Sequence, residues 1–362
     1  MENLEIMNNL TPDPSFWAGK RVLVTGHSGF KGGWLVLWLV HMGAKVTGIG
    51  LSPFSKPNLY DLAKISSLCD SRICDIRDAN SLQRLIQAED VDIVFHLAAQ
   101  SLVRPGYLNP IETFTTNLNG TINLLEAMRS SGTIRVGIIV TTDKVYKNRE
   151  WIWPYRESDE LGGTDPYSAS KVCAEIAVEC YRKSFLDECN ISISTVRAGN
   201  VIGGGDWSVD RLLPDAIRAW NGSQILTVRN PYSTRPWQYV LEPLAGYLIL
   251  AQKMFFNSKL SGPYNFGPKS DQVYSVKDVI EFAKGFHKSS RVEYLEREKN
   301  IPEAGELSLD SSKSQRHLGV GSRLDLYKSI EKTMNWYGAQ SGGSSMTELC
   351  FQEINAYSNI LS

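Results

Sequence analysis

A tyrosine and a lysine one helical turn apart are the strongest candidates for proton chemistry in this chain. Tyr167 and Lys171 stand at i and i+4 in DPYSASK, so in a helix both side chains lie on one face. Free tyrosine has a pKa of about 10 and is a poor base, but a cation one turn away favours the phenolate and lowers that pKa. The same spacing also occurs in exposed helical pairs, so the assignment depends on the surrounding segments.

A second polar group comes from the end of a predicted strand. VTTDKVY closes an apolar run that begins near residue 135 and leaves Thr141, Thr142, Asp143 and Lys144 after it. Ligands of open α/β sheets bind at the carboxyl ends of the strands. With a dinucleotide site nearby, these residues and the tyrosine–lysine pair predict a hydride-transfer centre.

The dinucleotide site is predicted by a glycine-rich loop between the first strand and the first long helix. GHSGFKG, residues 26–32, has the spacing G-x-x-G-x-x-G, a variant of the dinucleotide fingerprint. Glycines let the backbone turn tightly and approach a pyrophosphate, which then faces the N-terminus of the helix. Lys31 either adds a cation near the phosphates of the ligands or is a solvated lysine. The candidate loop residues are Gly26, Gly29, Phe30, Lys31 and Gly32.

The residues that would bind the adenosine half leave two alternatives open. An NAD site normally has a carboxylate at the end of the second strand, but this chain has the neutral Ser52 there, followed by Lys56. NAD is our expected cofactor, and NADP is not excluded by this stretch. Asp75, after the third strand, either accepts a hydrogen bond from the adenine amino group or caps the next helix.

The elements around these motifs alternate between short apolar runs and longer helical ones. Such βαβ units predict an α/β protein with a Rossmann-type doubly wound parallel sheet, whose strands are apolar because helices cover both faces. After residue 200 the predicted helices and strands become shorter and contain many Pro, Trp and Arg residues. This change predicts a smaller, mixed α/β substrate-binding region. We expect an N-terminal extension over residues 1–17, a dinucleotide domain with the catalytic residues over 18–200, a substrate region over 201–338, and a linker with a weakly specified helical tail over 339–362.

Composition excludes several classes of protein. The 362 residues carry 38 basic and 39 acidic side chains, so the chain lacks the excess of positive charge that is typical of nucleic-acid-binding proteins. The longest apolar stretch, residues 34–42, is too short to span a membrane. The first 17 residues lack the basic start and apolar core of a signal peptide. Six cysteines without metal-ligand spacing suggest reduced, buried thiols and no metal site, so we expect a cytoplasmic protein.

Longer motifs resemble a known family. GHSGFKG, FHLAAQSLVRPGY, TTDKVY, DPYSASK, RAGNVIGGGDW and RPWQYVLEPL together resemble the extended short-chain dehydrogenases/reductases, and among them the nucleotide-sugar 4,6-dehydratases. The resemblance spans residues 16–337 and is strongest to the branch that acts on CDP-glucose. It implies a hydro-lyase that oxidises C4 of CDP-D-glucose, eliminates water across C5 and C6, and returns the hydride to C6. The implied product is CDP-4-keto-6-deoxy-D-glucose, with NAD regenerated in each turnover.

The resemblance also assigns catalytic roles. Tyr167 would take the proton of the sugar 4-hydroxyl, Thr142 would hydrogen-bond that hydroxyl, and Lys171 would bind the nicotinamide ribose and hold the tyrosine pKa down. Asp143 would protonate the departing 6-hydroxyl. Lys144 replaces the glutamate of the dTDP-glucose branch. Either burial depresses its pKa enough for it to remove the C5 proton, or it stabilises the enolate while another group acts as base.

Further residues are implied as ligand contacts. Arginines suit a nucleoside diphosphate because a guanidinium binds phosphate oxygens bidentately, although each could instead be a surface ion-pair residue. Trp207 and Trp237 either cover the base or sugar, or pack in the core, which we favour. The implied cofactor contacts beyond the loop are Ser52, Asp75, Ile76, Leu97, Ala98, Ala99, Gln100, Thr116, Asn117, Tyr167 and Lys171. The implied substrate contacts are Ser101, Arg104, Thr142, Asn200, Arg211, Arg235 and Asn265.

Two other functions fit parts of the pattern. A nucleotide-sugar 4-epimerase would use the same tyrosine, lysine and threonine, but it needs no acid such as Asp143. A degenerate nucleotide-sugar-binding protein should have lost Tyr167, Lys171 or that acid, and all three are present. The resemblance further implies a homodimer through the helices that carry Tyr167 and Asn117, with a tetramer also open.

Overall fold

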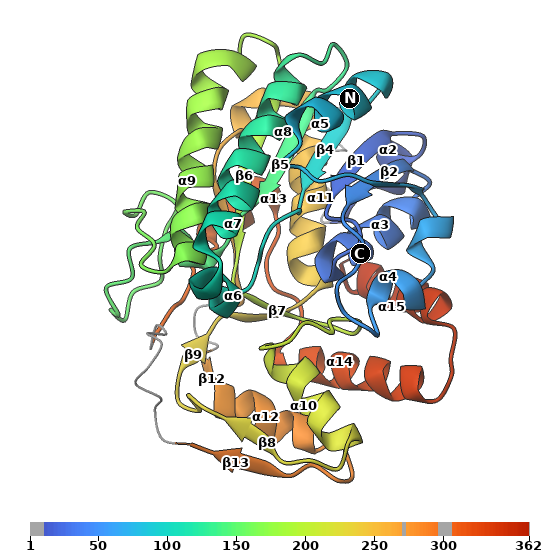
Figure 1. The fold of residues 1–362 in the computed structure, drawn as a ribbon, viewed down its shortest axis with the longest axis vertical. Coiled ribbons are helices and arrows are strands. Elements are labelled where there is room, and N and C mark those ends of the chain that lie inside the picture. The colour runs from blue at the N-terminus through green and yellow to red at the C-terminus, as the bar shows by residue number, and fades with distance from the viewer. Residues whose placement is uncertain (1–10, 270–272, 296–305, 362) are drawn as a thin grey trace.

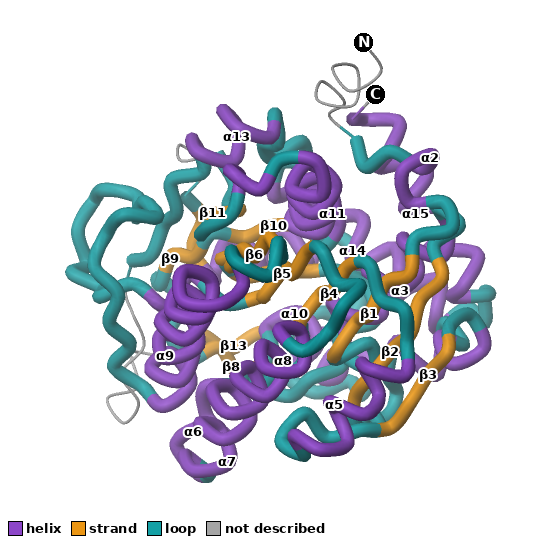
Figure 2. Tube along the Cα trace, turned by 90° about the horizontal axis from the view of Figure 1, so that it is seen from above, coloured by secondary structure: helices purple, strands orange, loops and turns teal. Residues whose placement is uncertain are grey.

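A parallel sheet of seven strands forms the centre of the molecule in the computed structural model, which describes residues 11–269, 273–295 and 306–361. The strand order is β11-β6-β5-β4-β1-β2-β3, and every neighbouring pair is parallel (Figure 2). The chain order reverses between β1 and β4, as in a doubly wound sheet. The strands are β1 (Arg21–Thr25), β2 (Lys45–Gly50), β3 (Asp70–Ile73), β4 (Ile93–His96), β5 (Val136–Val140), β6 (Ser192–Ala198) and β11 (Tyr264–Phe266).

Helices cover both faces of this sheet, which explains why its central strands are apolar along their whole length. Every residue of β4, β5 and β6 is buried. Two separate apolar clusters, one on each side of the sheet, form the core. The Rossmann-type prediction is therefore confirmed. One face carries α3 (Phe30–His41) and α11 (Leu241–Phe256), and the other carries α5 (Ala79–Ala88), α8 (Gly120–Arg129) and α9 (Pro166–Tyr181).

Short helical segments connect these elements, some after the carboxyl ends of strands and others before the next strand begins. A π-helical turn, Thr115–Asn119, joins α7 to α8, and a 3-10 turn, Asp143–Val145, follows β5. The other connecting helices are α4 (Leu59–Leu62), α6 (Val103–Leu108) and α7 (Pro110–Phe114), with further turns at Ile65–Ser67, Arg182–Leu186 and Ser258–Leu260.

A smaller unit lies below the sheet in Figure 1 and is built from the segment after residue 200. Helices α10, α12 and α14 pack against one another there, together with pairs of short strands. The same segment also returns to the sheet, because α11 and β11 belong to the large layer. The elements of the smaller unit are β7 (Asn200–Ile202), α10 (Leu212–Asn221), β8 (Leu226–Val228), β9 (Thr234–Arg235), β10 (Trp237–Tyr239), β12 (Tyr274–Ser275), α12 (Val276–Lys284), β13 (Val292–Tyr294) and α14 (Leu326–Ser341). The helix α13 (Ser312–Leu318) packs instead against α11 and β11 of the large layer.

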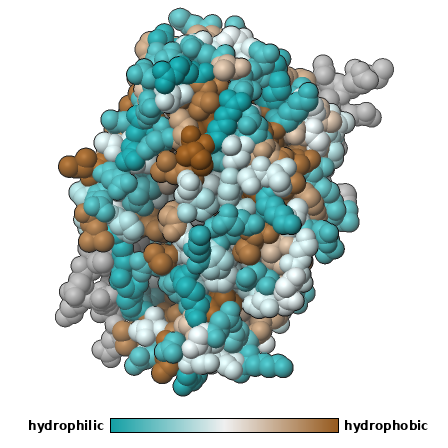
Figure 3. All heavy atoms as spheres, turned by 45° about the vertical axis from the view of Figure 1, so that its right-hand side comes forward, coloured by the Kyte–Doolittle hydropathy of each residue, from teal (hydrophilic) through white to brown (hydrophobic). Residues whose placement is uncertain are grey.

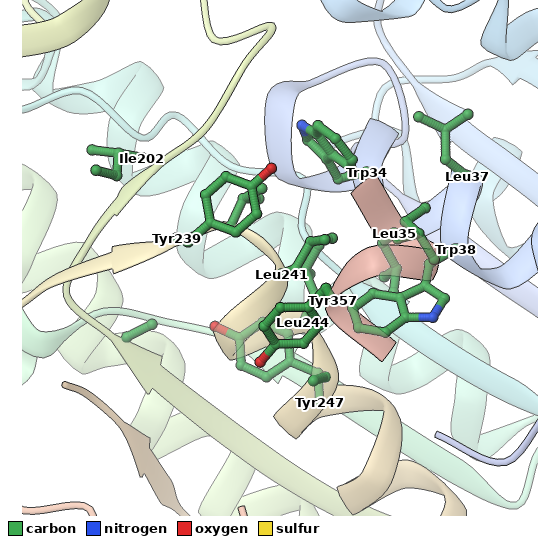
Figure 4. Packing of buried hydrophobic residues seen from close by; sticks show 14 of the residues in the cluster. Trp34, Leu35, Leu37, Trp38, Ile202, Tyr239, Leu241, Leu244, Tyr247 and Tyr357 are labelled. Carbon is green, nitrogen blue, oxygen red and sulfur yellow. The ribbon is translucent and has the colours of Figure 1, made fainter. Parts of the chain in front are cut away.

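The C-terminal segment forms α15 (Met346–Leu361), which packs against α3. Tyr357 is buried and meets Trp38 edge-on at 5.8 Å between ring centroids (Figure 4). His41 shares a hydrogen bond of 2.7 Å with Asn355. The tail is thus a docked helix whose buried face belongs to the main core, which its composition did not reveal.

The N-terminal extension is also partly docked. Its first ten residues lie outside the described part of the chain, but α2 (Pro14–Trp17) begins at an Asp13 cap and buries Phe16 and Trp17. The division of the chain at residues 17, 200 and 338 stays a prediction.

The cysteines require one correction to the expected burial. All six are free thiols, but only Cys74 and Cys350 are buried, whereas Cys180 and Cys189 are exposed. Both exposed cysteines lie near the end of α9, where the chain leaves the core. No helix in the described ranges is long and apolar enough to cross a membrane, and hydrophobic side chains on the face in Figure 3 occur in small, scattered groups.

Candidate active site

A cavity of about 920 Å³ runs along the carboxyl ends of the strands, from the loop after β1 to β8 and α12 of the smaller unit. It brings together residues from nearly every βα connection, as expected for an open α/β sheet. Three predicted site residues, Asn117, Asp143 and Asn265, are absent from its lining. The predicted residues that line it are Gly26, Gly29, Phe30, Lys31, Gly32, Ser52, Asp75, Ile76, Leu97, Ala98, Ala99, Gln100, Ser101, Arg104, Thr116, Thr142, Lys144, Tyr167, Lys171, Asn200, Arg211 and Arg235.

Two glycines of the loop after β1, Gly26 and Gly32, leave no room for a side chain. Gly26 has a left-handed backbone, with φ of 74°, and a Cβ there would lie 2.6 Å from the backbone nitrogen of Ala98. A Cβ on Gly32 would lie 2.0 Å from the carbonyl oxygen of Gly26. Gly29 caps α3 without a side-chain hydrogen bond, so the first N–H groups of the helix stay available to an anion. This geometry fits a dinucleotide pyrophosphate.

The adenosine end of the cavity is walled by the ends of β2 and β3. Ser52 lines it, and no carboxylate ends β2. Asp75 also lines it and binds Arg77 through both carboxylate oxygens, and these hydrogen bonds lower the pKa of Asp75. The alternative role of Asp75 as a helix cap is wrong, because Asp78 caps α5 by accepting from the Ser81 N–H.

Asn117 shapes the wall of the cavity from behind. Its amide nitrogen donates to the Gln100 carbonyl and to the Ser170 hydroxyl, and its amide oxygen accepts from the Gln100 N–H. It therefore fixes the loop after β4 against α9 without lining the cavity. Thr116, its neighbour in the π-helical turn, does line the cavity.

Tyr167 and Lys171 lie in the first turns of α9, and the residues just before them form a typical helix N-terminus. Asp165 caps the helix by accepting from the Ser168 N–H at 3.0 Å, the Ser168 hydroxyl closes the capping box, and Pro166 takes the first helical position. Both side chains line the cavity, and the Lys171 ammonium donates to the Val140 carbonyl at 3.0 Å.

Burial dominates the electrostatics of this pair. It raises the pKa of Tyr167 to about 12, while a hydrogen bond with Thr142 and the charge of Arg211 act in the opposite direction. It also lowers the pKa of Lys171 to about 8, against the charge of Glu175. The expectation that Lys171 holds the tyrosine pKa down is therefore wrong, because burial outweighs the opposing effects of Thr142 and Arg211 and the pKa of Tyr167 is raised.

The turn after β5 holds a buried carboxylate next to a half-exposed ammonium. Asp143 is fully buried, and its Oδ1 accepts from the Thr142 hydroxyl at 2.9 Å and from the Lys144 ammonium at 3.1 Å. Its Oδ2 has no hydrogen-bond partner within the described residues. Thr142, Asp143 and Lys144 form one hydrogen-bonded group at the cavity wall, so the residue absent from the lining still belongs to the site.

Cations from both sides converge on the opening between the sheet and the smaller unit. Arg211 donates to the Ser101 carbonyl at 3.2 Å, which links the start of α10 to the loop after β4. Asp210, whose backbone is left-handed, lies between Arg104 at 3.8 Å and Arg229 at 3.2 Å. An arrangement of this kind suits a diphosphate because guanidinium groups match phosphate oxygens.

Lys31 approaches the same region from α3. Its ammonium donates to the Tyr247 hydroxyl at 3.2 Å, and burial, followed by the charges of Lys171 and Arg211, lowers its pKa to about 7. A lysine with a lowered pKa in the cavity wall is part of the site and is not a solvated surface residue.

Asn265 does not contact the cavity, which corrects the expectation of a substrate contact. It is fully buried in β11, where its amide oxygen accepts from the Tyr146 hydroxyl at 2.7 Å and its amide nitrogen donates to the Tyr155 carbonyl. Both Trp207 and Trp237 are largely buried and also line the cavity, so packing and wall formation coincide.

Several lining residues were not predicted from the sequence. Asp206 lies within the GGGDW motif and Asp210 directly precedes Arg211, and these positions were the available signal. The residues of β8 line the cavity only because the tertiary fold brings that strand there, and no local sequence pattern predicted it. The unpredicted residues include Tyr146, Asn148, Asp206, Asp210, Asp215, Thr227, Arg229 and Asn230.

Known proteins resemble this chain over most of its length. The family model described as GDP-mannose 4,6 dehydratase matches residues 23–337. A CDP-glucose 4,6-dehydratase of Salmonella typhimurium is 43% identical over 351 residues, which cover 95% of this chain and 98% of the relative.

Solved structures share the fold. A UDP-glucose 4-epimerase of Stenotrophomonas maltophila with bound NAD superposes with a TM-score of 0.78 at 22% identity, covering 90% of this chain and all of the other. An NAD-dependent NDP-hexosamine 5,6-dehydratase involved in tunicamycin biosynthesis gives a TM-score of 0.73 at 25% identity, covering 88% and 98%. The first of these likenesses concerns the fold alone.

Proposed function

The chain belongs to the GDP-mannose 4,6 dehydratase family, and from this membership we propose that it is a CDP-glucose 4,6-dehydratase. It converts CDP-D-glucose to CDP-4-keto-6-deoxy-D-glucose and water. The observation that carries the proposal is the hydrogen-bonded group Thr142, Asp143 and Lys144 beside Tyr167 in one cavity, together with 43% identity to a CDP-glucose 4,6-dehydratase over nearly the whole chain.

The cavity fits NAD as the resident cofactor. The pyrophosphate cradle has no room for a Cβ at Gly26 or Gly32, and the adenosine end offers Asp75 as an acceptor for an amino group. Arg77, the cation that lines this end among the described residues, is already bound by Asp75, which disfavours a 2′-phosphate. When bound, NAD accepts hydride from C4 of the sugar and later supplies it to C6. Lys171 would hold the nicotinamide ribose, and Gln100, braced by Asn117, would position the loop beside it.

The first chemical task of the protein is to remove the proton of the 4-hydroxyl as C4 is oxidised. Tyr167 lies in the cavity wall and shares a hydrogen bond with Thr142, so a hydroxyl bound between the two meets both a base and an orienting group. Because burial raises the pKa of Tyr167, nearby cations must stabilise the phenolate. Arg211 supplies one such charge, and Lys171, one helical turn from Tyr167, would supply another while it is protonated.

The second task is elimination across C5 and C6. The 4-ketone acidifies the C5 hydrogen, a base removes that proton, the electron pair forms the C5–C6 double bond, and the 6-hydroxyl leaves as water after protonation. Asp143 would deliver the proton, since its Oδ2 is buried and has no partner among the described residues. Lys144 lies 3.1 Å from Asp143 and lines the cavity, so it can serve either as the base at C5 or as the cation that stabilises the enolate.

The substrate diphosphate would lie where the cations converge. Arg104, Arg211 and Arg235 line the cavity between the sheet and the smaller unit. Ser101 and Asn200 line the same part of the wall and would contribute hydrogen bonds to the sugar nucleotide.

Turnover across a panel of sugar nucleotides tests the proposal. We expect the enzyme with NAD to convert CDP-glucose faster than dTDP-, UDP- or GDP-glucose, with a 4-keto sugar that develops an ultraviolet chromophore in alkali. An Asp143→Asn variant should still oxidise C4 and accumulate reduced nicotinamide, because only the loss of water is blocked. Absence of the chromophore with every nucleotide would exclude the dehydratase, and conversion to the C4 epimer alone would identify an epimerase.

We further propose a cytoplasmic homodimer. Ile111 of α7 and Ile176 of α9 are 81% and 59% exposed on neighbouring helices, which supports an apolar face there for a second copy. Six free thiols support a reducing compartment. Size-exclusion chromatography with light scattering measures the mass, and an Ile176→Glu variant should shift a dimer to monomers.

A further inference from the structure

A buried carboxylate lies directly behind the catalytic wall. Glu175 of α9 is only 4% exposed, and its two oxygens together accept four hydrogen bonds. The Thr141 hydroxyl donates at 2.5 Å, the Thr195 hydroxyl at 2.7 Å, and the Arg197 guanidinium donates twice at 2.8 Å. Neither Glu175 nor Arg197 lines the cavity, so neither can touch the ligands directly.

These contacts fix α9 against the ends of two strands. Thr141 directly precedes Thr142 at the end of β5, whereas Glu175 follows Lys171 by one helical turn. The Glu175–Thr141 hydrogen bond therefore sets how far along α9 the pair Tyr167–Lys171 lies relative to Thr142. A displacement of about 1 Å between catalytic groups can reduce a rate roughly 100-fold.

Arg197 extends this support toward the outer edge of the sheet. It donates to the Tyr146 hydroxyl at 2.8 Å, and Tyr146 in turn donates to Asn265 of β11. Buried ion pairs cost desolvation free energy that apolar packing would avoid, so the fixed geometry is the plausible gain here. The role found for Asn265 is part of this support and not a substrate contact.

Glu175 also lies one helical turn after Lys171, and its negative charge favours the protonated lysine. The titratable groups around the Lys171 ammonium are Tyr167 and Glu175 on its own helix, Lys31 of α3 and His96 of β4. Burial lowers the pKa of His96 to about 3, so it is neutral, and Lys31 is itself a cation when charged. Asp143 is the other buried carboxylate near this group, and its charge acts on Lys31.

We propose that Glu175 is a positioning residue, whose carboxylate holds α9 in register with the ends of β5 and β6 and keeps Lys171 charged. It acts through Lys171 and Thr142 and not on the substrate. The reaction affected is the one given under the proposed function, on which this inference rests, but the state of Lys171 can be measured without any turnover.

The test compares two variants that separate the two effects. Glu175→Gln removes the charge and keeps the shape. We expect kcat to fall about tenfold or more with KM for CDP-glucose within about twofold, because ground-state binding does not involve Glu175. Without the negative charge the pKa of Lys171 falls below about 8, so the alkaline limb of the kcat profile moves to lower pH. Thr141→Val keeps the charge and should lower kcat without moving that limb.

The protonation of Lys171 is measured directly from its rate of acetylation by acetic anhydride as a function of pH, followed by peptide mass spectrometry. Glu242→Gln is the matched control, since Glu242 is 3% exposed and accepts from the Arg323 and Leu324 N–H groups away from the cavity. It should lose thermal stability and leave the Lys171 titration unchanged.

The outcomes are distinct. An unchanged Lys171 titration and an unchanged kcat in Glu175→Gln would overturn the inference, as would an equal shift in Glu242→Gln. If Glu175→Gln does not fold, a Thr141→Val enzyme with normal kcat overturns the register role. A wild-type enzyme inactive on every sugar nucleotide contradicts the proposed function, while the acetylation measurement still tests Glu175.

Discussion

The two ends of the cavity are built on different principles. At the cofactor end the wall is backbone, where Gly26 and Gly32 leave no room for a Cβ and Gly29 opens the N-terminus of α3. At the substrate end the wall consists of long charged side chains, such as Arg104 and Arg211, that cross between two units. A backbone cradle admits one kind of ligand group, whereas side chains can be exchanged. The difference teaches that binding of the cofactor pyrophosphate is fixed by the backbone fold, whereas substrate choice is set by replaceable side chains.

The sharpest test of this contrast is a single methyl group at the cofactor end. Gly32→Ala places a Cβ 2.0 Å from the Gly26 carbonyl oxygen, so the loop must shift. We expect NAD affinity to fall about 100-fold, corresponding to an overpacking cost of roughly 3 kcal/mol, as measured by isothermal titration calorimetry. Gly338→Ala, which meets nothing within 4 Å in α14, is the control. Equal NAD affinity in both variants would show that the cradle is not a rigid backbone site.

The substrate end should respond differently to the loss of a whole charged group. Arg211→Gln removes one guanidinium from the diphosphate region and one charge that lowers the pKa of Tyr167. We expect KM for CDP-glucose to rise roughly 30-fold, as for a charge-assisted hydrogen bond of about 2 kcal/mol, with NAD affinity nearly unchanged. Arg218→Gln controls for loop support, because Arg218 does not line the cavity itself but donates to the Trp207 and Ser208 carbonyls of a loop that does. If Arg211→Gln lowered NAD affinity as much as it raised the KM for CDP-glucose, the two ends of the cavity would not bind their ligands independently, and the contrast would be wrong.

The smallest effect is expected where the cofactor end does use a side chain. Asp75→Asn keeps the shape but weakens the pairing with Arg77, so NAD affinity should fall only about threefold to fivefold, as for one neutral hydrogen bond. Asp78→Asn, at the cap of α5, should leave NAD affinity unchanged, since Asn caps nearly as well as Asp. A loss for Asp75→Asn as large as that for Gly32→Ala would mean that side chains and not backbone carry the recognition of NAD.

The same contrast explains what the sequence could predict. The glycine loop, the capped start of α9 and the turn after β5 are local features, and residue types at fixed spacing identify them. Every loop residue predicted to face the cofactor lines the cavity. Local signals suffice there because a strand, a turn and a helix determine the geometry among themselves.

The substrate end depends on contacts between distant segments, and prediction was weaker there. Asn265 was placed at the substrate, but β11 pairs with β6 and turns its amide to Tyr146. Asp210 was overlooked although it joins Arg104 to Arg229 across the opening. The docking of α15 on α3 was also invisible, since its apolar face is interrupted by polar residues. Such features follow from tertiary packing and have no local sequence pattern.

The central claim is that one bound cofactor moves hydride within a single sugar, from C4 to C6. Incubation of the enzyme and NAD with CDP-glucose deuterated at C4, followed by mass spectrometry and proton NMR of the product, measures this directly. The account predicts CDP-4-keto-6-deoxyglucose with the deuterium retained at C6 and one solvent-derived hydrogen at C5. A product with deuterium still at C4, as in an epimer, or no deuterium at C6, would contradict it.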